Sequence, residues 1–135
     1  MYLTSSAWNH FAVVRKGSTF ELFINGKSGG TDTNSGSIPD NSNPFVIGAM
    51  FGNGNNPIDE CYISNFRIVK GTALYTSNFT PQTAELTQVH NTTLLACQSS
   101  SSATTEATGK TITANGNAAA STTNPSLVKG FDLSG

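Results

Sequence analysis

The sequence contains few charged residues, and this scarcity limits the partners that we expect for it. Asp, Glu, Lys and Arg make up 11% of the 135 residues, and the formal net charge is −1. The basic residues are spread along the chain from Arg15 to Lys129 and form no stripe. Binding to nucleic acid or to an anionic membrane surface needs clustered Lys and Arg. We therefore expect no nucleic-acid partner.

Long apolar runs are also missing. No run approaches the roughly 20 apolar residues that a membrane span needs, so we expect no insertion into a membrane. Residues 1–7 lack the basic and apolar regions of a signal peptide, so export by the ordinary secretory route is not supported. The polarity of the surface must come from Ser, Thr, Asn and Gly instead of charge.

Cysteine is scarce as well, which excludes a disulfide framework of the kind found in small secreted domains. The two cysteines are Cys61 and Cys97. They form either one disulfide bond or two free, buried thiols that behave as small apolar residues, and we favour the free thiols. With only two histidines elsewhere, they are also a poor set of zinc ligands.

What the chain does contain is a series of short apolar segments separated by turns, whereas helix signals are few. Turn-forming residues recur about every ten residues, a spacing typical of a sandwich or barrel. A loop or a single helical turn at 71–81 is expected to place Leu74, Tyr75 and Phe79 on the sandwich. The predicted strands cover residues 8–15, 19–25, part of 27–33, 45–50, 60–69 and 92–98, with a further short strand at 111–115.

The first two of these strands are expected to form a hairpin. Residues 8–15 carry apolar side chains on both faces of an extended strand, so we expect this strand to be central and covered on both sides. Residues 19–25 alternate more strictly, with Phe20, Leu22 and Ile24 on one face. The pair Asn25–Gly26 then predicts a type I′ turn, because both residue types tolerate positive φ.

Two longer motifs carry a family resemblance. Residues 8–27, WNHFAVVRKGSTFELFINGK, combine Trp-x-His, an apolar strand ending in Arg, a Gly turn and a strand ending in Asn-Gly. Residues 62–81, YISNFRIVKGTALYTSNFTP, combine an aromatic-Ile-x-x-aromatic-Arg-Ile motif with a Gly-x-Ala-x-Tyr loop. These motifs resemble the central hairpin and the closing strand of laminin-G-like (concanavalin A-like) jelly-roll domains. The resemblance implies an all-β fold, an antiparallel β-sandwich of the jelly-roll type.

The particular residues of these motifs, followed by TTLLACQ and ITANGNAAAS, resemble laminin-G-like modules in structural proteins of tailed phages, notably marine and cyanobacterial ones. The resemblance covers roughly residues 1–125. It implies a non-catalytic structural protein located in the virion, either a tail-fibre or appendage module or a capsid decoration module. Its partners would be other virion proteins and a host-surface glycan. The alternative is a calcium-assisted carbohydrate-binding module, that is, a lectin.

The resemblance also indicates a sandwich that is incomplete at its N-terminus. Members of the family usually carry several strands before the Trp-x-His strand, whereas residues 1–6 look like the end of one such strand. Exposed edge strands pair readily with another chain, so we expect a homo-oligomer or insertion into a larger assembly. We divide the chain into a sandwich at 1–98, a polar low-complexity linker at 99–110, and a C-terminal extension at 111–135 that docks on the sandwich or on a neighbouring chain.

The residues that could support catalysis are not arranged for it in the sequence. His10 has no nucleophile and orienting acid nearby, so we interpret it as a packed histidine at a strand edge. Glycoside hydrolysis needs two carboxylates about 5–10 Å apart. Asp59 and Glu60 are the only adjacent acids, and neighbours on a strand point to opposite faces. We therefore predict that the protein is not an enzyme.

Two kinds of binding site remain as hypotheses. A glycan would need an exposed aromatic side chain beside amide groups, and the chain offers two such sets. Calcium would need oxygen ligands in loops, although Asp is also simply a turn former. The candidates for glycan are Phe51 with Asn53, Asn55 and Asn56, and Tyr75 with Asn78; those for calcium are Asp32, Asp40 and Asp59; those for structural roles are Trp8, His10, Asn25, Gly26 and Arg67.

Overall fold

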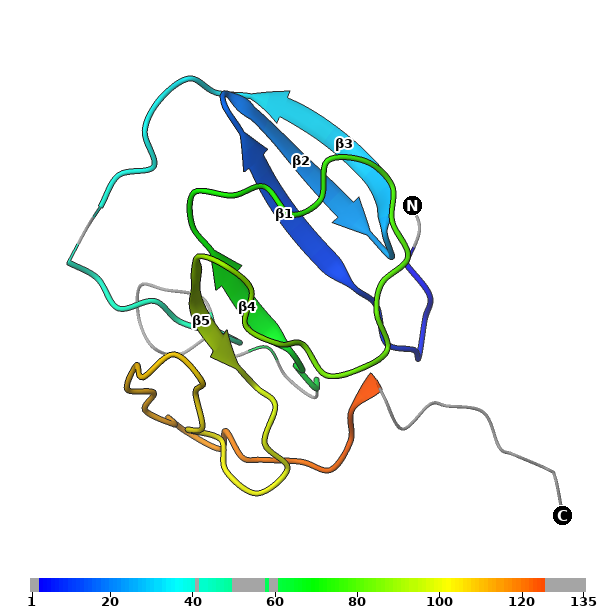
Figure 1. The fold of residues 1–135 in the computed structure, drawn as a ribbon. Helices are drawn as coiled ribbons and strands as arrows, with labels where there is room; N and C mark the ends of the chain where they lie inside the picture. Colours follow the sequence, from blue (N-terminus) through cyan, green and yellow to red (C-terminus); the bar gives the residue numbers. More distant parts are fainter. Residues whose placement is uncertain (1–2, 41, 50–57, 59–60, 126–135) are drawn as a thin grey trace, which may run out of the picture.

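Five antiparallel strands form two sheets (Figure 1) in a computed structural model that describes residues 3–40, 42–49, 58 and 61–125. The first sheet has the order β1-β2-β3, and the second pairs β4 with β5. No helix that could cross a membrane occurs in these ranges. The predicted fold class, an all-β antiparallel sandwich, is confirmed. The strands are β1 (Phe11–Lys16), β2 (Thr19–Ile24), β3 (Lys27–Thr33), β4 (Phe66–Val69) and β5 (Thr92–Ala96).

Two tight turns connect the strands of the first sheet. Gly17 begins the turn between β1 and β2 and has a φ of 62°. Asn25 and Gly26 connect β2 to β3 with φ values of 50° and 74°, as the Asn-Gly pair predicts for a type I′ turn. The backbone twist of such a turn matches the right-handed twist of the flanking strands, so the local sequence is enough to specify this three-stranded meander.

The two faces of this sheet differ in their burial. Register pairs Ala12 with Phe23 on the inner face, where Phe23 is completely buried. On the outer face, Phe11 and Val13 are 58% and 73% exposed. The prediction that the first strand is central and covered on both sides was therefore wrong, because β1 lies at an edge of the sheet and its outer face is open. We define the outer face by Phe11, Val13, Arg15, Phe20, Leu22, Ile24, Lys27, Gly30 and Asp32, of which Ile24 is buried.

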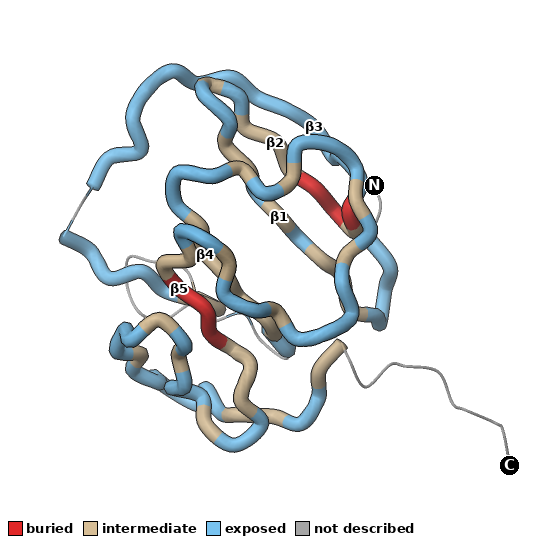
Figure 2. Tube along the Cα trace, in the orientation of Figure 1, coloured by how far each residue is buried: buried red, intermediate tan, exposed pale blue. Residues whose placement is uncertain are grey.

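Residues 71–81 cover the inner face as an extended loop, without the helical turn that was one of two expectations. This segment passes in front of the sheet in Figure 1 and places Phe79 against Phe23, with ring centroids 5.5 Å apart. Tyr75 and Phe79 are half-buried there, whereas Leu74 stays 36% exposed. Figure 2 shows the buried residues in two stretches, one at the end of β2 and one along β5. Full burial of an aromatic side chain such as Phe23 contributes about 1.5–3 kcal/mol.

The predicted strand at 60–69 is much shorter than expected, and Asn65 explains why. Asn65 has a φ of 56°, which interrupts the extended backbone just before β4 begins at Phe66. Its amide N–H donates to the carbonyl of Cys97 at 3.0 Å. Its Oδ1 accepts hydrogen bonds from the amide of Leu86 and from Nε2 of Gln98, both at 2.9 Å. Asn65 therefore ties three segments together where the sequence suggested a continuous strand.

Three other predicted strand segments are also absent. Residues 45–49 form no strand beyond an isolated bridge at Ala49, and Met50 lies outside the described residues. Phe45 and Val46 are 66% and 41% exposed, and no strand among the described residues pairs with this apolar run. Residues 111–115 form no strand either, and only Ile112 among them is half-buried. Residues 3–6 form no strand, and residues 5 and 6 lie in a turn.

The polar segment 99–110, which we predicted to be a linker, makes specific contacts with β5. Glu106 forms a bridge with Ala96, and its carboxylate accepts hydrogen bonds from the amides of Leu95, Thr108 and Lys110 and from the hydroxyl of Thr108. Desolvation raises the pKa of this carboxyl. The hydrogen bonds lower the pKa by more than desolvation raises it, and the result is a pKa of about 2. The carboxylate thus fixes the segment to the sheet through hydrogen bonds.

This arrangement predicts acid-sensitive stability. The folded pKa of Glu106 is about 2, below its ordinary value of 4.5, so the unfolded chain takes up the proton first as pH falls. The stabilisation by Glu106 is therefore complete above pH 4.5 and is lost between pH 4.5 and pH 2. Urea unfolding at several pH values should show a steeper loss for the wild-type protein than for Glu106→Gln. Parallel curves for the two proteins in this range would contradict the assignment.

Both cysteines are free thiols. Cys61 is exposed, contrary to the expectation that both would be buried, and Cys97 is half-buried. Cys97 follows the last residue of β5 and has a φ of 59°. Burial raises the pKa of its thiol above the ordinary value.

Candidate functional site

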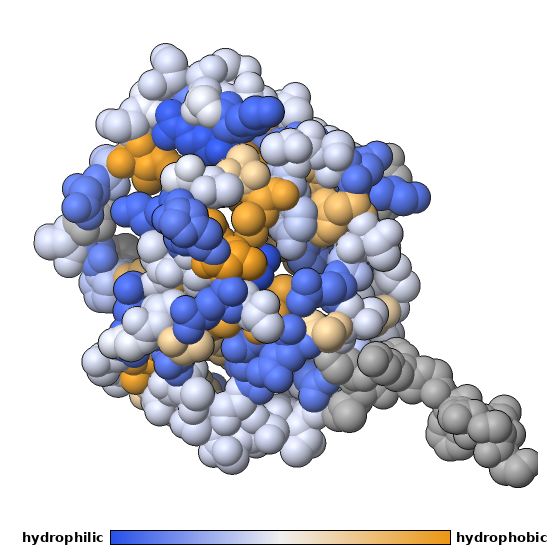
Figure 3. Space-filling view, viewed as in Figure 1, coloured by the Kyte–Doolittle hydropathy of each residue, from blue (hydrophilic) through white to orange (hydrophobic). Residues whose placement is uncertain are grey.

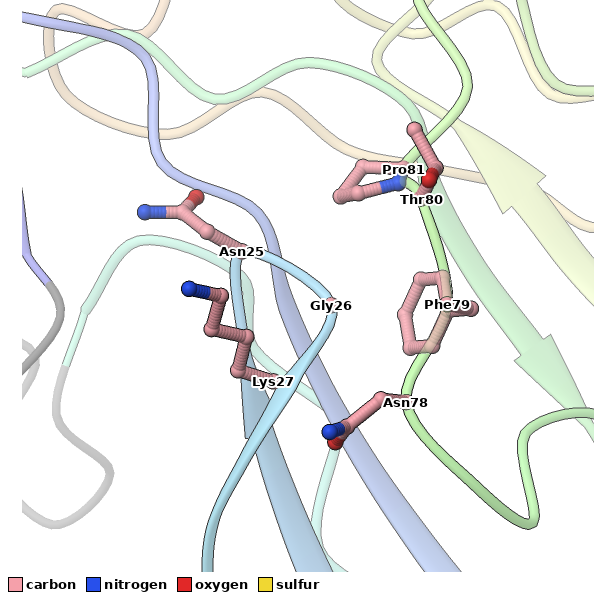
Figure 4. A pocket seen from close by; sticks show the side chains of 7 residues that line it. All are labelled: Asn25, Gly26, Lys27, Asn78, Phe79, Thr80 and Pro81. Carbon is pink, nitrogen blue, oxygen red and sulfur yellow. The ribbon is translucent and has the colours of Figure 1, made fainter.

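The segment that covers the inner face also crosses the turn between β2 and β3, and a hollow forms at this crossing. The amide of Phe79 donates to the carbonyl of Gly26 at 2.8 Å, and the amide of Ser28 donates to Oδ1 of Asn78 at 2.9 Å. These two bonds hold the segment against the turn. The hollow has a volume of about 380 Å³ and opens to solvent (Figure 4); it is lined by Asn25, Gly26, Lys27, Asn78, Phe79, Thr80 and Pro81.

The hollow combines polar and apolar groups. Figure 4 shows Asn25 and Lys27 on the turn, with Asn78, Phe79 and Pro81 facing them from the crossing segment. Oδ1 of Asn78 is engaged by Ser28, whereas its Nδ2 and the hydroxyl of Thr80 have no hydrogen-bond partner among the described residues. Concave sites that bind small molecules share this combination of apolar walls and a few directed polar groups.

A cluster of aromatic rings beneath the hollow fixes the crossing segment. Tyr75 and Phe79 stack with their ring centroids 3.8 Å apart. His10 meets both rings edge-on, at 6.1 Å from Tyr75 and 5.4 Å from Phe79. Phe79 also contacts Phe23, so this half-buried ring connects the hollow to the core.

His10 belongs to this cluster and makes no catalytic contact in the described part of the chain. Its Nδ1 is buried and has no hydrogen-bond partner there. Burial, and then the positive charge of Arg67, lower the pKa of His10 below its ordinary value. The backbone around His10 is held by Asn25, whose Oδ1 accepts from the His10 amide at 2.8 Å and whose own amide donates to the His10 carbonyl.

The structure separates the two residues that we grouped as a glycan site around Tyr75. Asn78 lines the hollow described above, whereas Tyr75 lines a second, smaller one of about 170 Å³ together with Val14, Lys16, Thr19, Glu21 and Thr76. One face of the Tyr75 ring is also occupied by Phe79. The other predicted glycan residues, Phe51, Asn53, Asn55 and Asn56, lie outside the described residues.

The calcium candidates do not form a carboxylate cluster in the described ranges. Asp32 lies on β3, exposed, with Oδ1 accepting from the amide of Thr33 at 2.8 Å. Asp40 is exposed in the loop after β3, and Asp59 lies outside the described residues. Residues 3–40, 42–49, 58 and 61–125 contain no group of three or more His, Cys, Asp or Glu side chains that could hold a metal. Calcium binding at these positions stays a prediction.

The remaining residues predicted to be structural lie in packing positions. Trp8 is half-buried and tilts against Tyr62, with ring centroids 6.5 Å apart. Arg67 donates from Nη1 to the carbonyl of Thr87 at 3.0 Å. Tyr62 itself is 61% exposed.

Sequence reasoning missed Lys27, Thr80 and Pro81 as residues of the hollow. Lys27 follows Gly26, and Thr80 and Pro81 follow Phe79, but only the crossing of two distant segments brings them together. A signal existed in the chain, because NGK is a polar turn and NFTP combines two polar residues with Phe79 and Pro81. Nothing in the order of residues indicates that these two turns meet.

Comparisons with known proteins give one match. A family model described as the concanavalin A-like lectin/glucanases superfamily matches residues 2–75, which is more than half of the chain. No curated protein and no solved structure matches.

Proposed function

Since the chain belongs to the concanavalin A-like lectin/glucanase superfamily, we propose that it is a non-catalytic binding module of a tailed-phage structural protein and contacts a host-surface glycan. It serves either in a fibre or appendage or as a capsid decoration. Two features support the virion setting. One is the sequence of the motifs at residues 8–27 and 62–81, and the other is the surface rich in Ser, Thr, Asn and Gly.

The observation that carries the glycan contact is the hollow at the crossing of the β2–β3 turn and residues 78–81. Its volume of about 380 Å³ is near the lower end of the roughly 300–1,000 Å³ found for small-molecule sites. That size suits one sugar unit better than a chain of several. Figure 3 shows this side of the molecule as mostly hydrophilic, with apolar side chains in small groups, which suits a polar ligand.

The described titratable groups support a non-catalytic role. A glycosidase needs a general acid with a raised pKa, whereas the pKa of Glu106 is lowered to about 2. His10 is packed among aromatic rings and is not oriented by an acid in the described residues. Binding, and not turnover, is what these residues favour.

Weak binding of single sugars is the expected result of the first test. At about −0.3 kcal/mol per non-hydrogen atom and about 12 such atoms, a monosaccharide would bind with a dissociation constant on the order of millimolar. Useful affinity would then come from several copies acting together. Saturation-transfer NMR with glucose, galactose and N-acetylglucosamine at millimolar concentration measures this directly.

Two variants connect the binding to the hollow. Thr80→Val removes a hydroxyl without changing size, and Asn78→Asp keeps the Oδ1 acceptor for Ser28 while removing the Nδ2 donor. Each should weaken binding about 3–10-fold, the effect of one lost hydrogen bond. Thr76→Val, in the smaller hollow, is the matched control and should bind as the wild type does. Equal affinities for Thr80→Val and Thr76→Val would place any sugar site elsewhere.

Chelation separates the proposal from the lectin alternative. If Asp32, Asp40 and Asp59 hold calcium that assists sugar binding, EDTA should abolish the NMR signal and added calcium should restore it. Binding that persists in EDTA supports the calcium-independent module. Release of sugar from a host polysaccharide would overturn the non-catalytic assignment. Mass spectrometry of purified phage particles tests the virion setting independently.

A further inference from the structure

His10 lies beneath the hollow and contacts residues of both of its walls. Its ring meets the ring of Phe79 edge-on with the centroids 5.4 Å apart, and its amide donates to Oδ1 of Asn25 at 2.8 Å. Figure 4 shows Asn25 and Phe79 on opposite sides of the hollow. We propose that protonation of His10 favours release of residues 71–81 from the β2–β3 turn, so that acid opposes binding in the hollow. The second half of this statement rests on the proposed sugar binding, and the first half does not.

The surroundings of the His10 ring suit its neutral form. Nδ1 is buried and has no hydrogen-bond partner among the described residues. A neutral imidazole can leave one ring nitrogen as an unused acceptor, whereas the imidazolium ion carries a proton on both nitrogens and needs an acceptor for each. Protonation in place would therefore bury a charged donor without a partner, which costs more than an unpaired neutral group.

The aromatic rings beside His10 do not compensate for a charge. Tyr75 and Phe79 are nearly parallel, at 7°, with centroids 3.8 Å apart, and the His10 ring lies 6.1 Å from the first and 5.4 Å from the second. Such similar distances to both members of a tight stack place His10 beside the stack and not over one of its faces. Aromatic rings are electropositive at their edges and attract cations at their faces. These two rings therefore give the imidazolium ion no cation–π stabilisation.

The charged groups around His10 act in the same direction. Arg67, on β4, lowers the pKa of His10 by its positive charge, after the larger effect of burial. Its guanidinium donates to a backbone carbonyl at 3.0 Å and has no carboxylate partner among the described residues, so its charge is not neutralised. The crossing segment contributes the phenol of Tyr75 and the turn contributes the amide of Asn25, neither of which supplies a negative charge. Lys27, which follows the turn, is also a cation.

Few contacts hold the crossing segment on the turn. Its polar contacts there are the bond from the Phe79 amide to the Gly26 carbonyl, at 2.8 Å, and the bond from the Ser28 amide to Oδ1 of Asn78, at 2.9 Å. Residues 74, 76–78 and 80 are exposed. A segment with so little buried surface opens at a lower free energy than the whole fold unfolds. Because the segment forms one wall of the hollow, its release also removes the hollow.

The direction of the pH effect follows from the lowered pKa of His10. In the opened segment the imidazole is hydrated and regains its ordinary pKa of 6.5, so the opened form takes up a proton first as pH falls. The closed form is therefore most stable above pH 6.5 and loses stability below it. Each pH unit favours opening by at most a factor of about ten, until the closed form is itself protonated. This window lies above the range of pH 4.5 to pH 2 in which Glu106 acts.

Hydrogen exchange at the Phe79 amide tests the release without any ligand. Its protection factor, which removes the intrinsic pH dependence of exchange, should fall several-fold, and at most about tenfold, between about pH 7.5 and about pH 5.5. The Lys70 amide, which donates to the Asn91 carbonyl beside the second sheet, should keep its protection. Equal losses at the two amides would mean that the whole fold unfolds, and would overturn a local release.

Variants of the two histidines assign the effect. His10→Phe keeps a ring in the cluster and cannot be protonated, so its Phe79 protection should not change over this pH range. His10→Gln serves the same purpose if the larger ring does not fit. His90→Gln changes the other histidine, which is exposed, and should keep the wild-type profile. The same profile in the wild-type protein and in both His10 variants would rule out His10 as the group responsible.

Added sugar tests whether the release concerns the hollow. A ligand that binds only the closed form raises protection by the factor 1 + [L]/Kd, so N-acetylglucosamine at ten times its dissociation constant should raise Phe79 protection about tenfold. Unchanged protection despite binding in the saturation-transfer experiment would overturn the link between the segment and the site. If no sugar binds at any pH, the proposed function fails, whereas the pH profiles of the wild-type protein and His10→Phe still decide the release.

Discussion

Replacing Gly26 with alanine is expected to destabilise the protein by about 3 kcal/mol or more. Gly26 has a φ of 74°, and a non-glycine residue in this region costs about 1–2 kcal/mol. An added Cβ would also overlap the carbonyl oxygen of Phe79 and come within 2.9 Å of Cδ of Pro81. Overpacking of this kind costs a further 1–3 kcal/mol or so, because the crossing segment must move. Urea unfolding measures the sum.

Gly17→Ala separates the two contributions. Gly17 has a similar φ of 62° in the other tight turn, but a Cβ there would meet nothing within 4 Å. Gly17→Ala should lower the free energy of unfolding by only about 1 kcal/mol, from backbone conformation alone. Because Gly26 lines the hollow, Gly26→Ala should also weaken sugar binding, whereas Gly17→Ala should not. Equal destabilisation by the two variants would mean that residues 78–81 do not press on the turn.

Asn65→Ala is expected to destabilise the protein by about 3 kcal/mol. Alanine at a φ of 56° costs about 1 kcal/mol more than asparagine, which tolerates the left-handed region. The change also removes the Oδ1 that accepts from the Leu86 amide and from Gln98. Leaving a half-buried donor without its partner costs about 1–3 kcal/mol. Denaturant unfolding gives the total, and hydrogen exchange at the Leu86 amide reports the lost bond.

Asn91→Ala is the matched control for this change. Asn91 has a comparable φ of 67°, but it is exposed and its side chain bonds only to the Thr72 hydroxyl, at 3.2 Å, among the described contacts. The Asn91→Ala variant should lose about 1 kcal/mol of its free energy of unfolding, which is the cost of the backbone conformation. A loss at Asn91 as large as that at Asn65 would show that the three-segment junction contributes nothing beyond the turn.

The parts of the fold that were predicted correctly are those in which neighbouring residues decide the structure. The alternation in β2 and the Asn25–Gly26 turn specify the meander, because turn type and strand register are both local properties. Asn65 shows why structure that depends on distant residues was not predicted. An asparagine in an apolar run reads as a tolerated strand residue, and only its partners Leu86, Cys97 and Gln98 reveal a junction.

The candidate site was harder to predict than the fold, for a related reason. Asn78 was identified, but Tyr75, its expected companion, lies in a different hollow. Residues three apart in an extended segment do not share a surface when one ring turns inward to stack, as Tyr75 does on Phe79. The linker at 99–110 was read from composition, which cannot indicate that one carboxylate, Glu106, finds several backbone donors on and beside β5.

The crossing of residues 71–81 over the β2–β3 turn also imposes an order on folding. The strands β1, β2 and β3 are contiguous and joined by tight turns, and such hairpins form within roughly 1–10 µs. Phe79 comes much later in the chain, and closing the intervening loop carries a larger entropic cost. The meander therefore forms first, with Phe23 in contact with water until Phe79 arrives. On the ribosome, where the chain emerges from its N-terminus, that interval lasts until residue 79 has left the exit tunnel, and it is the stage at which aggregation would compete with folding.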